Sequence, residues 1–305
     1  MKRKRLTALC AAAVLPLLAV MASNVLTSNH AASGHVVSNR ARSSHVVSSY
    51  GASIQAESTY AASNHAVTMA GRVARSLRGG DDWSLIFDDE FEGGSLDTGL
   101  WRPGWFGTGI TGPVNSEEAQ GYDSRNVSVS DGHLALRLTA THGALVSTNP
   151  HDGRAFGGFE FTGPALMEAR IYTPGGTTIS GWPAFWSDGQ NYPADGEIDV
   201  MEGLAGQLCF HVHQITGGPG QCTDIGPGWH TYSAYWDPSA QTVTFSYDGF
   251  PVGSEAFANS GAPQYLILDN TSSATPVPDT MLVDWVHVWQ LHQYQNPHPL
   301  AALPR

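Results

Sequence analysis

The sequence predicts an all-β sandwich or jelly roll, because its apolar residues recur with a period of two and its turns carry hairpin signals. Residues 133–138 and 229–236 alternate between large apolar residues and small or polar ones. Asp131-Gly132 and Asp248-Gly249 separate such runs, and Asp-Gly is a strong signal for a tight hairpin. No segment has the 3.6-residue period of a long amphipathic helix. Many short strands joined by Gly-rich turns favour two packed sheets.

The N-terminus has the pattern of a secretory signal peptide. Positions 2–5 are basic, positions 6–19 are apolar, and Val20-Met21-Ala22 offers a small-residue cleavage site. A retained membrane anchor is the alternative, but the apolar run is short for a bilayer and contains Pro16. We therefore predict a signal peptide at 1–22, a secreted protein, and no membrane attachment after cleavage.

The cysteine count agrees with export. Cys10 lies inside the predicted signal, which leaves Cys209 and Cys222 in the mature protein. Two cysteines in an oxidising compartment favour a single disulfide, which would close a loop just after residue 202. Two unpaired thiols are the alternative.

The composition divides the rest of the chain. Residues 23–80 are rich in Ser, Ala, His and Asn and contain few large apolar residues, so burial cannot offset the entropy of ordering them. We expect a disordered linker or propeptide there, a folded β-sandwich domain at 81–292 and a C-terminal tail at 293–305.

The predicted domain is strongly acidic. Of the 27 acidic residues of the chain 26 lie after position 80, against six of the 15 basic residues, a net charge of −20. Such a surface repels phosphate backbones, which argues against nucleic-acid binding. Both lysines lie at positions 2 and 4, so the mature protein lacks the lysine that Schiff-base chemistry requires.

Three carboxylates within six residues form the most informative motif. On a regular strand Glu197 and Asp199 share a face and Glu202 points away, but one inserted residue, a β-bulge, returns Glu202 to that face. Two carboxyl groups about 5–5.5 Å apart are what a retaining glycosidase uses, one as nucleophile and one as acid/base. Three like charges on one face should raise at least one pKa, and Glu202, as proton donor, is the natural candidate. A calcium cluster or a solvated edge is the alternative, but the apolar residues between the acids favour a strand.

The flanks of this motif resemble a known family. Residues 181–186 read Gly-Trp-Pro-Ala-Phe-Trp, and residues 195–203 read Asp-Gly-Glu-Ile-Asp-Val-Met-Glu-Gly. Both resemble the active-site region of glycoside hydrolase family 16, in the Glu-x-Asp-x-x-Glu branch of laminarinase-type endo-β-1,3-glucanases. Further matches, in the family's order, are 87–91, 96–97, Trp101, 126–132, 168–170, 229–236, 248–249 and 283–286. The resemblance implies a concanavalin A-like jelly roll of two curved antiparallel sheets with a concave substrate cleft.

The same resemblance assigns roles to the acids. It implies that Glu197 is the nucleophile and Glu202 the acid/base, and that Asp199 orients the nucleophile. Trp182 and Trp186 are candidate platforms for sugar rings, since indole faces stack on pyranoses. Core packing is the alternative for each, and either Phe185 or Trp186 must face away from the cleft.

Further candidates flank the acids in the sequence. The family's pattern implies that Glu168 and Arg170 contact the sugar and brace the catalytic acids; a surface ion pair is the alternative. His213 aligns with a histidine that often lies beside the catalytic glutamates. His211 shares its face, which leaves a His-x-His metal pair or a structural histidine open.

The resemblance also suggests one structural calcium ion and no cofactor for catalysis. The matching positions are Glu90, the backbone of Gly132, and Asp284, and a hard cation would suit so acidic a domain. An edge-strand acid facing solvent is the alternative for Asp284. Two departures from the family pattern, at Glu117 and at Asp269, put the identity of the glycan in question.

Taken together, the sequence predicts a secreted, monomeric, retaining endo-glycosidase that hydrolyses the polysaccharide β-1,3-glucan. The alternatives are a transglycosylase, a hydrolase of another β-glycan such as lichenan or agar, and a non-catalytic lectin on the same fold.

Overall fold

The computed structural model describes residues 83–152, 157–259 and 261–291 of the 305-residue chain. The predicted signal peptide, the linker and the C-terminal tail therefore lie outside the described residues, as do residues 81, 82 and 292 at the two ends of the predicted domain. Within the described part no helix has the length and apolar character that crossing a bilayer requires.

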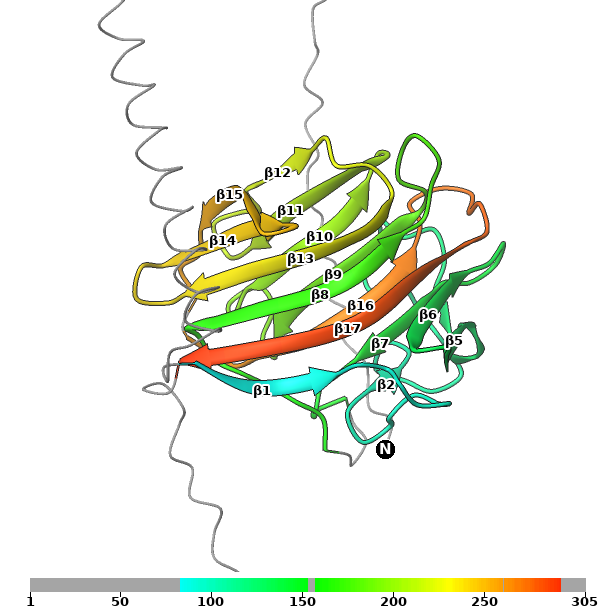
Figure 1. Ribbon diagram of the computed structural model, residues 1–305, viewed down its shortest axis with the longest axis horizontal. Coiled ribbons are helices and arrows are strands. Elements are labelled where there is room, and N and C mark those ends of the chain that lie inside the picture. The colour runs from blue at the N-terminus through cyan, green and yellow to red at the C-terminus, as the bar shows by residue number, and fades with distance from the viewer. Residues whose placement is uncertain (1–82, 153–156, 260, 292–305) are drawn as a thin grey trace, which may run out of the picture. The chain divides into compact units, whose positions relative to one another are not determined.

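The described residues form two large antiparallel sheets packed face to face, so the predicted all-β jelly roll is confirmed (Figure 1). One sheet has the order β15-β14-β13-β8-β17-β6-β5, with β1 also paired to β17. The other has the order β12-β11-β10-β9-β16-β7-β2 and will be called the cleft sheet. The first will be called the outer sheet. A short β3–β4 pair stands apart from both.

The strands of the outer sheet are β1 (Trp83–Asp89), β5 (Val127–Ser130), β6 (His133–Leu138), β8 (Ala165–Thr173), β13 (Gly228–Asp237), β14 (Thr242–Tyr247), β15 (Phe250–Ala256) and β17 (Asp279–Leu291). Those of the cleft sheet are β2 (Arg102–Pro103), β7 (Ala144–Ser147), β9 (Trp182–Gly189), β10 (Glu197–Leu204), β11 (Gln207–His213), β12 (Gly220–Thr223) and β16 (Gln264–Thr271). The remaining elements are β3 (Ile110–Thr111), β4 (Tyr122–Asp123) and the single 3₁₀ turn η1 (Ser124–Asn126).

The core lies between the two sheets, and alternation along each strand fills it. On β8 the side chains of Met167, Ala169 and Ile171 are fully buried, whereas the residues between them face away from the core. Both predicted hairpin turns are present, with Asp131 and Asp248 at φ 54° and 51° and each following glycine also at positive φ. This is the geometry that an Asp-Gly turn supplies at low steric cost.

Strand β10 carries the predicted bulge. Its register with β9 shifts between Asp199 and Met201, and its register with β11 shifts between Asp199 and Glu202. Val200 and Met201 are both fully buried in the core, as is Ile198. Two successive core-facing residues interrupt the alternation, so the bulge brings Glu202 back to the face of the other two acids.

Candidate active site

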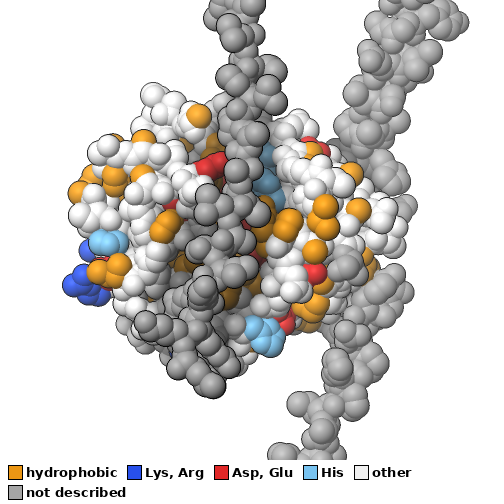
Figure 2. Space-filling model, turned by 180° about the vertical axis from the view of Figure 1, so that it is seen from behind, with side chains coloured by type: hydrophobic (Ala, Val, Ile, Leu, Met, Phe, Trp, Pro, Cys, Tyr) orange, Lys and Arg blue, Asp and Glu red, His pale blue; other side chains and the backbone are white. Residues whose placement is uncertain are grey.

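A cavity of about 590 Å³ lies over the open face of the cleft sheet and contains all three acids of the motif. Its described lining also includes Trp182, Trp186 and His213, so the structure brings together six of the residues predicted to act there. Figure 2 shows this face of the molecule, on which acidic and histidine side chains gather while arginine is seen at the edge. Among the described residues, neither lysine nor arginine lines the cavity.

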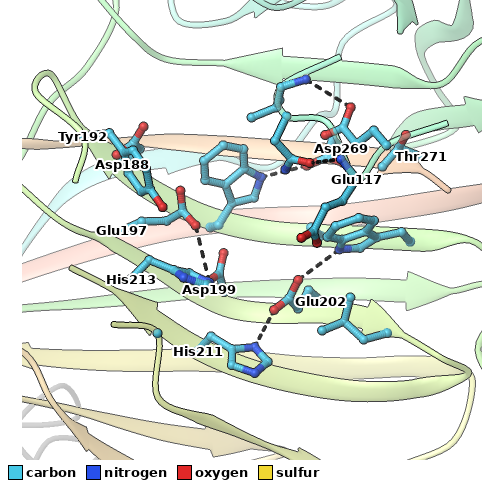
Figure 3. Close-up of a pocket in the computed structure, with 18 of the residues that line it drawn as sticks. Glu117, Asp188, Tyr192, Glu197, Asp199, Glu202, His211, His213, Asp269 and Thr271 are labelled. Carbon is cyan, nitrogen blue, oxygen red and sulfur yellow. Dashed lines mark hydrogen bonds and ion pairs between the residues drawn. The ribbon is translucent and has the colours of Figure 1, made fainter. Parts of the chain in front are cut away.

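Glu202 is held by two neighbouring strands. The indole Nε1 of Trp182 on β9 donates a hydrogen bond to Oε2 (3.0 Å), and Nδ1 of His211 on β11 lies 2.5 Å from Oε1 (Figure 3). Both carboxyl oxygens are thereby fixed in direction, although the cavity leaves the group open to a ligand. His211, for which sequence reasoning left a structural role open, is thus a contact of the predicted acid/base.

His213, the histidine predicted from the sequence, lies beside the other two acids. Nε2 of His213 lies 3.3 Å from Oδ2 of Asp199 and 3.8 Å from Oε1 of Glu197. Each histidine faces its own carboxylates, and the ligand atoms of Glu197, Asp199 and His213, and likewise those of Asp199, Glu202 and His211, lie within 4.8 Å of one another. A positive charge on His213 favours the ionised form of the predicted nucleophile.

The predicted rise in pKa occurs at Glu197 and at Asp199. Burial raises the pKa of Glu197 well above its usual range, and the charges of Asp199, Asp188 and Glu202 add to this while His213 opposes it. Burial likewise raises the pKa of Asp199, with Glu202, Asp188 and Asp269 as further causes. The assignment of Glu202 as proton donor stays a prediction and rests on its position.

The alternation of side chains along β9 decides which of Phe185 and Trp186 faces the cleft. Phe185 is fully buried in the core between the sheets, whereas Trp186 lines the cavity. Trp186 is only 6% exposed, and its Nε1 donates a hydrogen bond of 2.7 Å to Oδ1 of Asp269 on β16. Trp105 lies against it at a centroid distance of 5.8 Å. Trp186 therefore forms the floor of the cavity rather than a freely exposed platform.

Glu168 and Arg170 are not part of this site, which corrects the sequence interpretation. Both lie on β8 of the outer sheet, and neither lines the cavity. Arg170 Nε lies 3.4 Å from Oδ2 of Asp284, and its guanidinium stands over the ring of Trp229. Their even spacing placed the pair on one face as expected, but sequence alone could not tell which sheet carries that face.

The predicted calcium ligands are not brought together as a set. Asp284 is matched by Arg170, and Glu90 Oε1 lies 2.8 Å from Nε2 of His287, which Asp88 also approaches. Next to Gly132 the nearest side chain is that of Glu92. Calcium prefers six to eight oxygen ligands, and a neighbouring guanidinium disfavours it. The ligand atoms of Asp88, Glu90 and His287 lie within 4.8 Å of one another, and calcium binding stays a prediction from the resemblance.

Two acids of the cavity, Asp188 and Glu118, were missed from the sequence. Asp188 on β9 lies directly opposite Glu197, and Glu118 lines the cavity together with Glu117 and Asp269, the two departures from the family pattern. Burial raises the pKa of Asp188 and of Glu118 to about 7. Asp188 could have been found, because it continues the period-two row of Trp182, Ala184 and Trp186.

The predicted disulfide is confirmed, and it joins Cys209 to Cys222 across β11 and β12.

Fold and site together define a carbohydrate-active jelly roll with a carboxylate-lined cleft, and comparison with known proteins agrees. Residues 162–217 match the model of the XgeA-like catalytic domain of glycoside hydrolase family 16. The glucan endo-1,3-β-glucosidase A1 of Niallia circulans is 26% identical in an alignment 264 residues long, which covers 68% of this chain and 38% of that protein. The chain thus spans well under half the length of that relative.

Solved structures show the same fold. The endo-β-1,3-glucanase of Pyrococcus furiosus matches with a TM-score of 0.55 and 23% identity over 70% of this chain and 96% of that one. A pseudo β-1,3-glucanase of Mycobacterium tuberculosis matches with a TM-score of 0.53 and 25% identity, over 68% and 99%. These matches support glycoside hydrolase family 16, in its laminarinase-type branch, as the family that this chain resembles.

Proposed function

We propose that the protein is a retaining endo-β-1,3-glucanase that cleaves laminarin-like polysaccharide by double displacement. The observation that carries this proposal is the bulge of β10, which turns Glu197, Asp199 and Glu202 onto one face inside a single cavity. The relatives named above, which are described as β-1,3-glucanases, support the choice of linkage.

In the first step Glu197 attacks the anomeric carbon, and Glu202 protonates the departing oxygen. Trp182 and His211 hold the carboxyl group of Glu202 in one orientation, and His213 favours the charge on Glu197. Asp199 keeps its proton to higher pH than a free aspartic acid does, so it adds less negative charge beside the nucleophile. In the second step Glu202 takes a proton from water, which then releases the sugar from Glu197.

A panel of polysaccharides tests the substrate. Incubation with laminarin, lichenan, agarose and carrageenan should release reducing ends fastest from laminarin. Faster cleavage of agarose would overturn the choice of glycan and leave the two-carboxylate mechanism standing. No release from any of the four would favour a non-catalytic carbohydrate-binding protein on this fold; one neighbour is described as a pseudo β-1,3-glucanase.

Transglycosylation uses the same residues and differs only in the acceptor of the second step. Product analysis at high oligosaccharide concentration separates the two activities, because elongated products mark transfer to sugar rather than to water.

We also propose that the protein is exported and acts as a monomer on polysaccharide outside the cell. The Cys209–Cys222 disulfide supports export, since such bonds persist in oxidising compartments. N-terminal sequencing of protein recovered from the culture medium should find residue 23 or a later residue first. Recovery of the full chain from the cytoplasm alone would contradict export.

A further inference from the structure

A fourth carboxyl group stands beside the predicted nucleophile. On the antiparallel pair β9–β10, Asp188 lies directly opposite Glu197, and both side chains line the cavity (Figure 3). Side chains at such opposed positions have Cβ atoms about 4.5–5.5 Å apart. A second carboxylate here repels the first when both are charged, and this repulsion destabilises the folded state. A functional role would explain why an acid stands at this position.

The surroundings of Asp188 hold one of its oxygens and leave the other without a partner. The hydroxyl of Tyr265 on β16 donates a hydrogen bond to Oδ2 (3.2 Å). Among the described residues Oδ1 has no hydrogen-bond partner of normal geometry, although the residue is only 6% exposed. The amide of Gly189 donates to the carbonyl of Gly196 (3.2 Å) and also acts on the carboxyl group of Asp188, whose pKa it lowers. A buried polar atom without a partner is destabilising, and a bound hydroxyl group would relieve that cost.

The strands arrange these groups in one row across the cleft sheet. Tyr265 on β16, Asp188 on β9, Glu197 on β10 and His213 on β11 are successive cross-strand partners. A sugar whose anomeric carbon reaches Glu197 therefore lies over the same row and carries its ring hydroxyls within reach of Asp188.

We infer that Asp188 is a sugar-binding residue whose free oxygen forms a hydrogen bond with a hydroxyl of the ring held over Glu197. This inference rests on the proposed function and assigns the residue that positions the attacked sugar. Tyr265 fixes the direction of the carboxyl group from the opposite side. Because Asp188 and Glu197 face each other, the same residue also affects the ionisation of the nucleophile.

The effect of the Asp188 charge on the pKa of Glu197 has a definite direction. Burial raises the pKa of Asp188 to about 7, hydrogen bonds from the Tyr265 hydroxyl and the Gly189 amide lower it, and Asp195 in the adjoining turn raises it. Negative charge on Asp188 in turn raises the pKa of Glu197, as does that on Asp199, whereas His213 lowers it. The exposed Tyr192 completes the groups that face this corner of the cavity. Removing the charge of Asp188 should therefore let Glu197 ionise at lower pH.

The test is Asp188→Asn, which keeps the shape of the side chain and removes its charge. On laminari-oligosaccharides the variant should lose about 3- to 10-fold in kcat/KM, mainly through KM, as the loss of one hydrogen bond predicts. The acidic limb of its kcat/KM profile, which reports groups of the free enzyme, should move to lower pH. Tyr265→Phe should move that limb in the same direction by less, since without the hydroxyl Asp188 keeps its proton longer.

Asp224→Asn is the matched control, because Asp224 is exposed and does not line the cavity. It should leave both KM and the pH profile unchanged. A folded Asp188→Asn protein, with the melting temperature of wild type, whose KM and acidic limb match those of wild type would overturn the assignment. Inactive wild type on every glycan would instead remove the proposed function, so the two failures can be told apart.

Discussion

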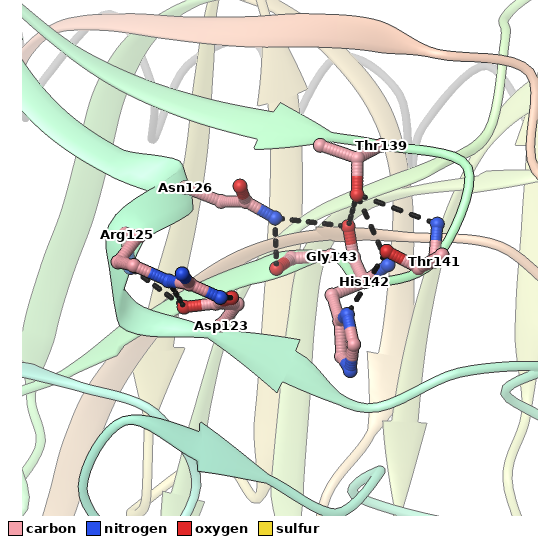
Figure 4. A network of polar contacts seen from close by, with 7 residues as sticks. All are labelled: Asp123, Arg125, Asn126, Thr139, Thr141, His142 and Gly143. Atoms are coloured by element: carbon pink, nitrogen blue, oxygen red, sulfur yellow. Dashed lines mark hydrogen bonds and ion pairs between the residues drawn. The ribbon is translucent and has the colours of Figure 1, made fainter.

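The carboxyl group of Asp123, at the start of the turn η1, and the carboxyl groups of the cleft have opposite electrostatic surroundings. In the turn, Arg125 donates to both oxygens of Asp123, with Nη2 only 2.6 Å from Oδ2 (Figure 4). The side-chain hydrogen bonds from Arg125 lower the pKa of Asp123 to about 2. In the cleft no lysine or arginine lines the cavity, and burial raises the pKa of Asp188 to about 7.

The outer sheet follows the pattern of the turn. Arg170 faces Asp284, and His230 Nδ1 lies 2.6 Å from Oδ2 of Asp248. Carboxylates outside the cleft thus have arginine or histidine partners, whereas those of the cleft have histidines alone. The difference teaches that the acidic domain keeps the permanent charge of arginine away from the acids of the cleft, where protons can be exchanged with a substrate.

Replacing the nucleophile should give the largest effect. Glu197→Gln should lower kcat on laminarin by more than about a thousand-fold, because the covalent intermediate cannot form. Circular dichroism should show an unchanged fold, since the change removes a buried repulsion. Activity within tenfold of wild type would assign the nucleophile elsewhere.

Replacing the acid/base should give the next largest effect. Glu202→Gln should lose about 10²–10⁴-fold on polysaccharide, the usual contribution of general acid–base catalysis. Substrates with good leaving groups should still glycosylate Glu197, and azide should restore turnover by replacing activated water. Full activity of this variant on laminarin would show that the assignment is wrong.

The pKa shifts predict how stability depends on pH. Asp188 and Glu118 both have folded-state pKa values raised to about 7 by burial, so between about pH 4 and pH 7 the folded state binds more protons than the unfolded state. Stability should therefore fall as the pH rises through this window. A thermal melt at pH 5 should give a higher melting temperature than one at pH 8, and the Asp188→Asn variant should show less of this difference. Equal melting temperatures in wild type would contradict the burial of uncompensated acids.

The smallest effect is expected on the outer sheet. Arg170→Ala should leave kcat and KM for laminarin unchanged, because the pair with Asp284 lies outside the cavity. Both side chains are about two-fifths exposed, so its loss should cost at most about 1 kcal/mol of unfolding free energy. Asp284→Asn serves as the matched variant. A large rise in KM would contradict this placement and would support the role in sugar binding that the family pattern implied for Arg170.

Local patterns in the sequence predicted much of the fold and the centre of the site. The bulge followed from the spacing of Glu197, Asp199 and Glu202, and the disulfide from a count of two mature cysteines. Period two also separated Phe185 from Trp186. Each of these depends on residues near one another in the chain.

What could not be predicted depends on which strands become neighbours. Arg170 and Asp284 meet because β8 pairs with β17, and no local pattern reveals that their face lies away from the cleft. Asp269 reaches Trp186 only because β16 lies beside β9. The contact of His211 with Glu202 depends on the register that the bulge creates between β10 and β11.

The most direct test of the account is the configuration of the first product. Hydrolysis of a laminari-oligosaccharide, followed by proton NMR before mutarotation, reports which anomer forms. Because Glu197 and Glu202 act on the two faces of the anomeric carbon in two displacements, the account predicts that the β-anomer appears first. Initial formation of the α-anomer would show a single displacement by water and would contradict the role of Glu197 as nucleophile.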